Sequence, residues 1–145
     1  MPILFTVGDL FEGNHDALVN PVNCMGVSGA GLAREFRNRF PVQQLKYESL
    51  CRRNGLNIGQ IFVTKCPQII YFPTKIHWNH SSKLEYIEQG LVALEVFLEK
   101  SNVRSIGIPA LGCGLGLLKF KDVKPLFSQY LSSLVQEIVV YQSLA

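Results

Sequence analysis

Two glycine-rich segments constrain the fold of this chain more than any other feature. Residues 26–31 follow an apolar run at 17–22, residues 112–116 follow another at 103–108, and a helical pattern comes after each. A strand, a glycine loop and a helix N-terminus together bind anions, because backbone N–H groups point outward and the helix dipole favours negative charge. One such loop is commonly only a tight turn, whereas two at the same edge of a sheet predict a diphosphate held between them.

Apolar periodicity predicts that strands and helices alternate along the chain. Strands are expected at 3–7, 17–22, 60–66, 68–72, 103–108 and 137–141. Helices are expected at 32–40, at 42–53, from a capping box of Ser82 and Glu85 to just before Ser101, and at 120–134. The runs on either side of Pro67 should pair as antiparallel neighbours, and 73–80 reads as a polar-aromatic loop. Helices between strands predict a largely parallel sheet with helices on both sides.

Length and composition favour one globular domain over residues 1–145, which we expect to be a monomer. The chain is 48% hydrophobic and 17% charged, and its net charge of +3 permits a nucleic-acid partner without requiring one. Its four cysteines form no C-x-x-C pair, so a zinc ribbon is not expected. No leader pattern and no membrane-spanning run is present, so we expect a cytoplasmic protein with free thiols and no membrane partner.

Lys75 is the residue with the sharpest chemical interpretation. A lysine is usually a solvated charge, but burial at an enclosed site lowers its pKa from about 10.4 and frees the amine as a nucleophile. Such an amine forms a Schiff base with an aldehyde-like sugar carbon. His77 and His80 could shuttle protons or bind phosphate, and no third metal ligand stands near them, so no metal is expected.

Several other polar residues allow two interpretations. Cys24 and Cys113 are rival nucleophiles near helix N-termini, which would lower their pKa, although a packing role is favoured. Asn20 and Asn23 either bind ribose hydroxyls or cap a turn, and Asp9 either binds an adenine amino group or begins a turn. The loops carry no G-K-[ST] ending and no acidic residue suited to a ribose, which disfavours P-loop and Rossmann sites.

Five motifs in order resemble the macrodomain family over nearly the whole chain. They are Gly-Asp-Leu-Phe at 8–11, Leu-Val-Asn-Pro-Val-Asn-Cys-Met-Gly at 18–26, Gly-Ala-Gly-Leu-Ala at 29–33, Phe-Pro-Thr-Lys-Ile-His-Trp at 72–78 and Ile-Pro-Ala-Leu-Gly-Cys-Gly at 108–114. The Thr-Lys-x-His-Trp block is similar to the DarG-type branch, which removes ADP-ribose from thymine bases in DNA. The chain is also similar to the terminal ADP-ribose protein glycohydrolases.

This resemblance implies a three-layer α/β/α sandwich with a mixed, largely parallel central sheet and a cleft for ADP-ribose. Lys75 would be the catalytic lysine, and no cofactor would be needed. The adenine would lie at Asp9 and Leu10, and the distal ribose at Asn20, Val22, Asn23, Thr74 and Lys75. The diphosphate would lie between Ser28, Gly29, Ala30, Gly31 and Leu32 in the first loop and Gly112, Cys113, Gly114, Leu115, Gly116 and Leu117 in the second.

The function that the resemblance implies is hydrolysis of the N-glycosidic link between ADP-ribose and thymine in single-stranded DNA. This role is antitoxin-like, so a cognate ADP-ribosyltransferase toxin is a candidate partner. Three departures bear on it. Ala30 replaces a usual lysine, and Asn79 replaces a frequent arginine. The second loop reads Gly-Leu-Leu-Lys-Phe at 116–120, where relatives usually carry Gly-Leu-Asp-Trp or an acidic residue within the loop. They leave two alternatives open: an ADP-ribose reader without hydrolysis, and a glycohydrolase for ADP-ribosylated protein.

Overall fold

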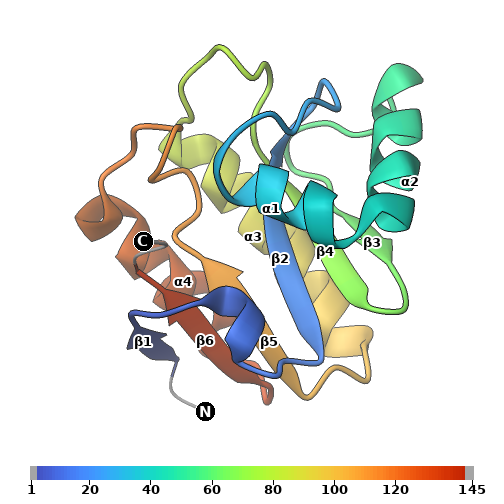
Figure 1. The fold of residues 1–145 in the computed structure, drawn as a ribbon. Coiled ribbons are helices and arrows are strands. Elements are labelled where there is room, and N and C mark those ends of the chain that lie inside the picture. The colour runs from blue at the N-terminus through green and yellow to red at the C-terminus, as the bar shows by residue number, and fades with distance from the viewer. Residues whose placement is uncertain (1–2, 143–145) are drawn as a thin grey trace.

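A six-stranded sheet runs through the centre of the molecule in the order β1-β6-β5-β2-β4-β3 (Figure 1). The computed structural model describes residues 3–142. The strands are β1 (Leu4–Thr6), β2 (Ala17–Asn23), β3 (Phe62–Thr64), β4 (Gln68–Lys75), β5 (Ser105–Pro109) and β6 (Glu137–Tyr141). Neighbouring strands are parallel except β3 and β4, which are antiparallel. The expected mixed, largely parallel sheet and the antiparallel pair around Pro67 are therefore confirmed.

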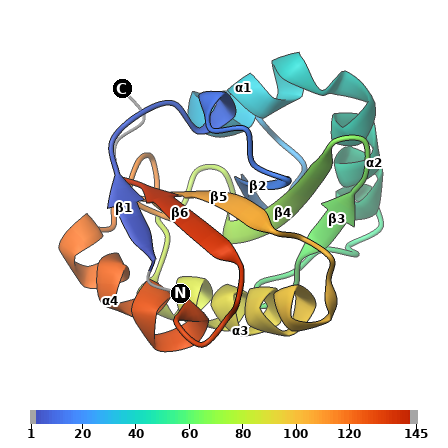
Figure 2. The ribbon, with the colours of Figure 1, turned by 90° about the horizontal axis from the view of Figure 1, so that it is seen from below.

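Helices cover both faces of this sheet, which gives three layers (Figure 2). The 3-10 helix η1 (Leu10–Glu12), α1 (Gly31–Arg39) and α2 (Pro41–Arg52) lie on one face, and α3 (Leu84–Lys100) and α4 (Phe120–Leu131) lie on the other. Each face buries its own apolar cluster: Val19, Phe72 and Leu91 belong to the cluster under α3 and α4, whereas Phe36 and Tyr71 belong to the other. The alternation of strand side chains between the two clusters holds the layers together.

The end of β4 differs from the sequence prediction in a way that matters for the site. Thr74 and Lys75 are the last residues of the strand, not part of a loop beginning at residue 73. Parallel pairing with β2 continues to this point, where a bulge after Val22 places Asn23 opposite Lys75. Pro73 is compatible with this strand end because it pairs with Val22 just before that irregularity. Lys75 is therefore positioned by the sheet itself.

The predicted capping box before α3 is wrong. The helix begins at Leu84, and Lys83 at its N-cap makes no side-chain hydrogen bond to it. Ser82 is buried instead, and its N–H donates to the carbonyl of Gly116 at 2.9 Å. The second glycine loop therefore holds the backbone of Ser82, and the Ser82 hydroxyl makes no hydrogen bond to the helix.

Other element bounds shift by a few residues. The first helix ends at Arg39 and α2 begins at Pro41, one residue before the expected start, because the N1 residue of a helix needs no N–H. The strand expected at 60–66 is only Phe62–Thr64, and α4 ends at Leu131 rather than residue 134. Within residues 3–142, no helix combines the length and the apolar character that crossing a membrane requires.

Candidate functional site

A cleft of about 840 Å³ opens at the carboxyl ends of β2, β4 and β5. Its walls come from the first glycine loop and the start of α1, from the end of β4, and from the second glycine loop. Figure 1 shows these three connections together at one end of the sheet. Ligands of open α/β sheets bind in this place. The expectation that three segments distant in sequence line one crevice is confirmed.

Most of the residues singled out from the sequence line this cleft. They are Val22, Asn23, Ser28, Gly29, Ala30, Gly31, Leu32, Thr74, Lys75, Gly112, Gly114, Leu115 and Gly116. Five others do not line it: Asp9, Leu10, Asn20, Cys113 and Leu117. The walls also include residues that sequence reasoning did not select, notably Glu35, Trp78, Pro109 and Ala110.

Asn23 organises the first glycine loop through its side chain. Its Oδ1 accepts hydrogen bonds from the N–H groups of Met25 at 3.0 Å and Val27 at 3.3 Å. Its Nδ2 donates to the carbonyl of Val27 at 2.8 Å, and the hydroxyl of Tyr47 donates to Oδ1 from α2. The turn-capping interpretation of Asn23 is therefore confirmed. Among residues 3–142, one N–H of its amide has no hydrogen-bond acceptor, so it can donate to a ligand.

The first loop delivers an uncapped helix N-terminus to the cleft. Ala30 is the N-cap of α1 and offers no side-chain acceptor to the first N–H groups of the helix. Gly31 has a φ of +59°, a left-handed conformation that glycine adopts without strain. Ser28 is fixed behind the loop by Gln44, whose Nε2 donates to its Oγ at 2.9 Å. N–H groups without an intrahelical partner form a binding site for an anion.

The second loop is closed almost entirely by its own backbone. Leu118 N–H donates to the carbonyl of Gly112 at 2.9 Å, and Leu117 N–H donates to that of Gly114 at 3.1 Å. Leu115 reaches across toward the first loop, with its Cδ1 3.8 Å from where a Cβ on Gly31 would lie. The two glycine loops therefore face each other across a gap that a small anionic group can enter.

Lys75 lies between the β4 end and the second loop. Its Nζ donates to the carbonyl of Trp78 at 3.3 Å and to that of Leu115 at 3.4 Å. Burial lowers the pKa of Lys75 below its ordinary value, which confirms the expected direction. A neutral amine satisfies both carbonyls with its two N–H groups and keeps its lone pair free, so this setting suits a nucleophile.

The two cysteines near the loops do not match the sequence expectation of a lowered pKa. Burial raises the pKa of the Cys24 thiol, and it raises the pKa of Cys113 to about 11. Desolvation outweighs the nearby helix N-termini because both side chains are partly buried, and Cys113 packs against the apolar cluster under α3 and α4. Both thiols are therefore protonated at neutral pH and are poor nucleophiles.

Two of the residues outside the cleft wall are fully buried. Asn20 is 0% exposed, and neither polar atom of its side chain has a hydrogen-bond partner among the described residues. Leu10 belongs to the apolar cluster around Phe36 and Tyr71. Neither residue lines the cleft. The only sequence signal for Asn20 was that a polar residue stands near the end of a strand. In the structure, the side chain of Asn20 in β2 is buried in the interior.

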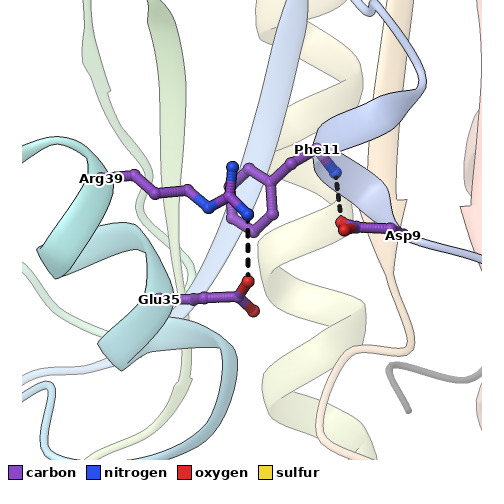
Figure 3. A network of polar contacts seen from close by, with 4 residues as sticks. All are labelled: Asp9, Phe11, Glu35 and Arg39. Atoms are coloured by element: carbon purple, nitrogen blue, oxygen red, sulfur yellow. Dashed lines mark hydrogen bonds and ion pairs between the residues drawn. The ribbon is translucent and has the colours of Figure 1, made fainter.

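A polar network stands at the α1 end of the cleft (Figure 3). Asp9 caps η1, where its Oδ1 accepts the N–H of Phe11 at 2.9 Å, so the turn interpretation of Asp9 is confirmed. Arg39 lies over the ring of Phe11, 4.1 Å from its centroid, and pairs with Glu35 at 3.3 Å. Glu35 follows Leu32 by three residues on α1, a spacing that places the two on one helical face and would have identified it.

No group of three or more His, Cys, Asp or Glu side chains within residues 3–142 is arranged to hold a metal ion. His77 and His80 lie near the cleft, with ring centroids 5.1 Å apart, but no third such ligand joins them in that part of the chain. The chemistry that the described site offers is therefore anion binding by backbone N–H groups beside one partly buried amine.

Comparisons with known proteins agree with this geometry. The Macro domain family matches residues 19–127. A Mycobacterium tuberculosis protein named DNA ADP-ribosyl glycohydrolase is 42% identical over 128 residues, covering 84% of this chain and 36% of the relative. The chain thus spans little more than a third of that relative's length.

Two solved structures are similar over nearly the whole chain. The macrodomain of Thermus aquaticus DarG superposes with a TM-score of 0.92 at 39% identity, covering 98% of this chain and 99% of that one. Thermosipho africanus DarTG in complex with ADP-ribose gives a TM-score of 0.94 at 30% identity, covering 99% of this chain and 42% of that one.

Proposed function

Because the chain belongs to the Macro domain family, we propose that it is an ADP-ribosyl glycohydrolase that frees thymine bases of single-stranded DNA from ADP-ribose. The observation that carries the proposal is the partly buried amine of Lys75 beside two facing glycine loops. The names of the similar proteins support the substrate: one is a DNA ADP-ribosyl glycohydrolase, and another was solved with ADP-ribose.

We propose one orientation for ADP-ribose in the cleft. Its diphosphate lies between the N-terminus of α1 and the second loop, where backbone N–H groups offset its charge. Its distal ribose then lies at the Lys75 end, close to Thr74 and to the free N–H of Asn23. Its adenosine lies toward Glu35 and Phe11 at the opposite end. This orientation brings the anomeric carbon of the distal ribose to the amine.

Hydrolysis then proceeds through the Lys75 amine. The amine attacks the anomeric carbon, the bond from that carbon to a thymine ring nitrogen breaks, and the bonding electron pair leaves with the nitrogen, which takes up a proton. Ring opening gives a Schiff base between Lys75 and the sugar. One water molecule hydrolyses it to ADP-ribose and restores the amine. The net reaction consumes one water and yields ADP-ribose and an unmodified thymine.

The α1–α2 layer offers positive charge beside the cleft for a DNA strand. Residues 31–53 contain six Lys or Arg and two Glu. Arg39 is engaged by Glu35 and Phe11, which leaves exposed Arg34 as the better candidate for a phosphate contact. An unpaired strand is the expected substrate, because a base inside a duplex cannot reach an amine in a cleft. Since such a bond must first be made, an ADP-ribosyltransferase is the expected functional partner.

A second candidate is an ADP-ribose reader without hydrolysis. Its supporting observation is that the second loop reads Gly-Leu-Leu-Lys-Phe at 116–120, without the acidic residue that relatives usually carry within this loop. Glu35 lines the cleft, but it is paired with Arg39 at the adenosine end, far along the ligand from the reacting carbon. A third candidate is a glycohydrolase that acts on ADP-ribosylated protein.

The deciding experiment replaces Lys75 by alanine. We expect release of ADP-ribose from a thymine-modified single-stranded oligonucleotide to fall about 1,000-fold or more, because loss of a nucleophile leaves only binding and positioning. The affinity for ADP-ribose, measured by calorimetry, should fall only modestly. Some loss is expected because Nζ also donates to the carbonyl of Leu115 in the second loop. Activity of the wild type should rise with pH until the neutral amine predominates, below the ordinary lysine pKa.

Lys121→Ala is the matched control, because it removes the same charge from exposed α4. Equal turnover by Lys75→Ala and the wild type would exclude the lysine mechanism. Binding of ADP-ribose without release from DNA or from glutamyl-modified protein would identify the reader. Release from the protein alone would identify the third candidate.

A further inference from the structure

Trp78 stands out because it is both exposed and part of the cleft wall. Its side chain is 54% exposed, and it lies in the connection between β4 and α3. A large aromatic side chain in water forgoes the stabilisation that burial would give it. Where such a side chain borders a ligand cleft, an apolar flat surface of the ligand can recover that stabilisation.

The connection that carries Trp78 is held by hydrogen bonds. The N–H of Cys24 donates to the carbonyl of Ile76 at 3.1 Å, and the N–H of His80 donates to that of His77 at 3.0 Å. Asn79 N–H donates to Nδ1 of His77 at 3.1 Å, which fixes the orientation of that ring. The indole is therefore presented by a defined backbone.

His77 lies next to the indole. The two ring centroids are 5.3 Å apart with an interplanar angle of 33°, and the ring of His80 is tilted against that of His77 with centroids 5.1 Å apart. Such aromatic neighbours contact the indole and help to position it. We call these three rings, of Trp78, His77 and His80, the aromatic platform, and Trp78 is its member in the cleft wall.

The platform adjoins the reacting amine. Nζ of Lys75 donates to the backbone carbonyl of Trp78 at 3.3 Å, so the residue that carries the indole is in direct contact with the amine. In the proposed orientation of ADP-ribose, the group bonded to the anomeric carbon lies at this end of the cleft. The indole of Trp78 is uncharged, and Trp78 is the platform residue that contacts the amine. The platform therefore suits the face of a base rather than a phosphate.

We propose that Trp78 stacks against the thymine that carries the ADP-ribose, and so makes this site selective for a planar nucleobase as the leaving group. This inference rests on the proposed glycohydrolase function and specifies its substrate. Stacking on an aromatic side chain changes binding by about 5- to 150-fold per base when that side chain is truncated. The discrimination should therefore be seen in catalytic efficiency on the base-linked substrate and not in affinity for ADP-ribose.

The test compares Trp78→Ala, Trp78→Phe and the wild type on three ligands. These are ADP-ribosylated thymidine as the nucleoside, an ADP-ribosylated thymine oligonucleotide, and ADP-ribose alone. Trp78→Ala should lower kcat/KM on both thymine substrates about 5- to 150-fold, and Trp78→Phe should restore part of it. The Kd for ADP-ribose should stay within about twofold, because the platform contacts only the base. Leu45→Ala, on exposed α2, is the control for loss of an apolar surface group.

The outcomes separate this inference from the proposed function. A wild type that releases nothing from either thymine substrate overturns the proposed function, and the inference with it. An active wild type matched by Trp78→Ala overturns the inference alone. So does a loss confined to the oligonucleotide, which would indicate stacking of a neighbouring base, or an equal loss of ADP-ribose affinity.

Discussion

The two glycine loops face the same cleft but are stabilised in different ways. The first, between β2 and α1, is held by side chains: Asn23 bonds to the backbone at Met25 and Val27, and Gln44 holds Ser28. The second, between β5 and α4, is held by backbone hydrogen bonds within the loop and to Ser82. Loops with similar sequences can thus obtain their rigidity from different parts of the chain.

This difference has a consequence for the chemistry. The side chains that fix the first loop come from β2 and α2, so that loop is held without the Lys75 amine. The second loop accepts a hydrogen bond from the Lys75 amine at the carbonyl of Leu115. The position of the second loop is therefore linked to the Lys75 amine. A ligand that binds the amine would also alter the hydrogen bond from the amine to this loop.

The largest effect should come from adding a methyl group to the second loop. In Gly116→Ala the new Cβ would lie 2.5 Å from the carbonyl oxygen of Gly112 and even closer to the Ser82 hydroxyl. Because one of these atoms is backbone, we expect a loss of about 3 kcal/mol in the free energy of unfolding, measured by chemical denaturation.

Gly29→Ala is the matched control in the first loop, where a Cβ would meet nothing within 4 Å. Its stability should stay near that of the wild type, within about 0.5 kcal/mol, as for exposed sites in general. Comparable losses in both variants would show that the two loops do not differ in backbone packing.

A smaller effect should follow from removing the side chain that holds the first loop. Asn23→Ala leaves the N–H groups of Met25 and Val27 without their acceptor and the Val27 carbonyl without its donor. We expect a loss of about 2 kcal/mol in stability, since partners of a deleted buried group are left unsatisfied. ADP-ribose affinity, measured by calorimetry, should fall together with it.

Leu115→Ala is the corresponding deletion in the second loop, where the side chain is exposed and backbone bonds persist. It should change stability by no more than about 0.5 kcal/mol. If Leu115→Ala destabilised the protein as much as Asn23→Ala, side chains would hold both loops and the contrast would fail.

Local patterns in the sequence were sufficient for the layers, the strand order along the chain and the segments that meet at the cleft. Glycine loops after apolar runs, and Lys75 after a third such run, carried that prediction. What they could not supply were facts set by tertiary pairing. Asn20 turns into the core, Ser82 is held by Gly116 rather than capping α3, and the half-buried Cys113 has a raised pKa.

The residues that sequence reasoning missed share a physical reason. Glu35 and Trp78 face the cleft because of where α1 and the β4–α3 connection are packed, and neither sits in a glycine loop. The helical spacing from Leu32 gives a signal for Glu35 only once the cleft-facing side of α1 is known. The polar residues around Trp78 in the sequence were a signal for it, but the exposure of its side chain cannot be predicted from one sequence.

The smallest effect concerns backbone conformation in the second loop. Leu117 has a φ of +68° and a side chain 74% exposed, so it sits in a left-handed conformation with little packing to offset the strain. In Leu117→Gly the relief of that strain opposes the greater entropy of the unfolded glycine. We expect stability between unchanged and about 1 kcal/mol higher in chemical denaturation, because the left-handed strain is of that size or larger. A clear loss of stability would mean that the Leu117 side chain holds this loop, and that the loop does not rest on its backbone alone.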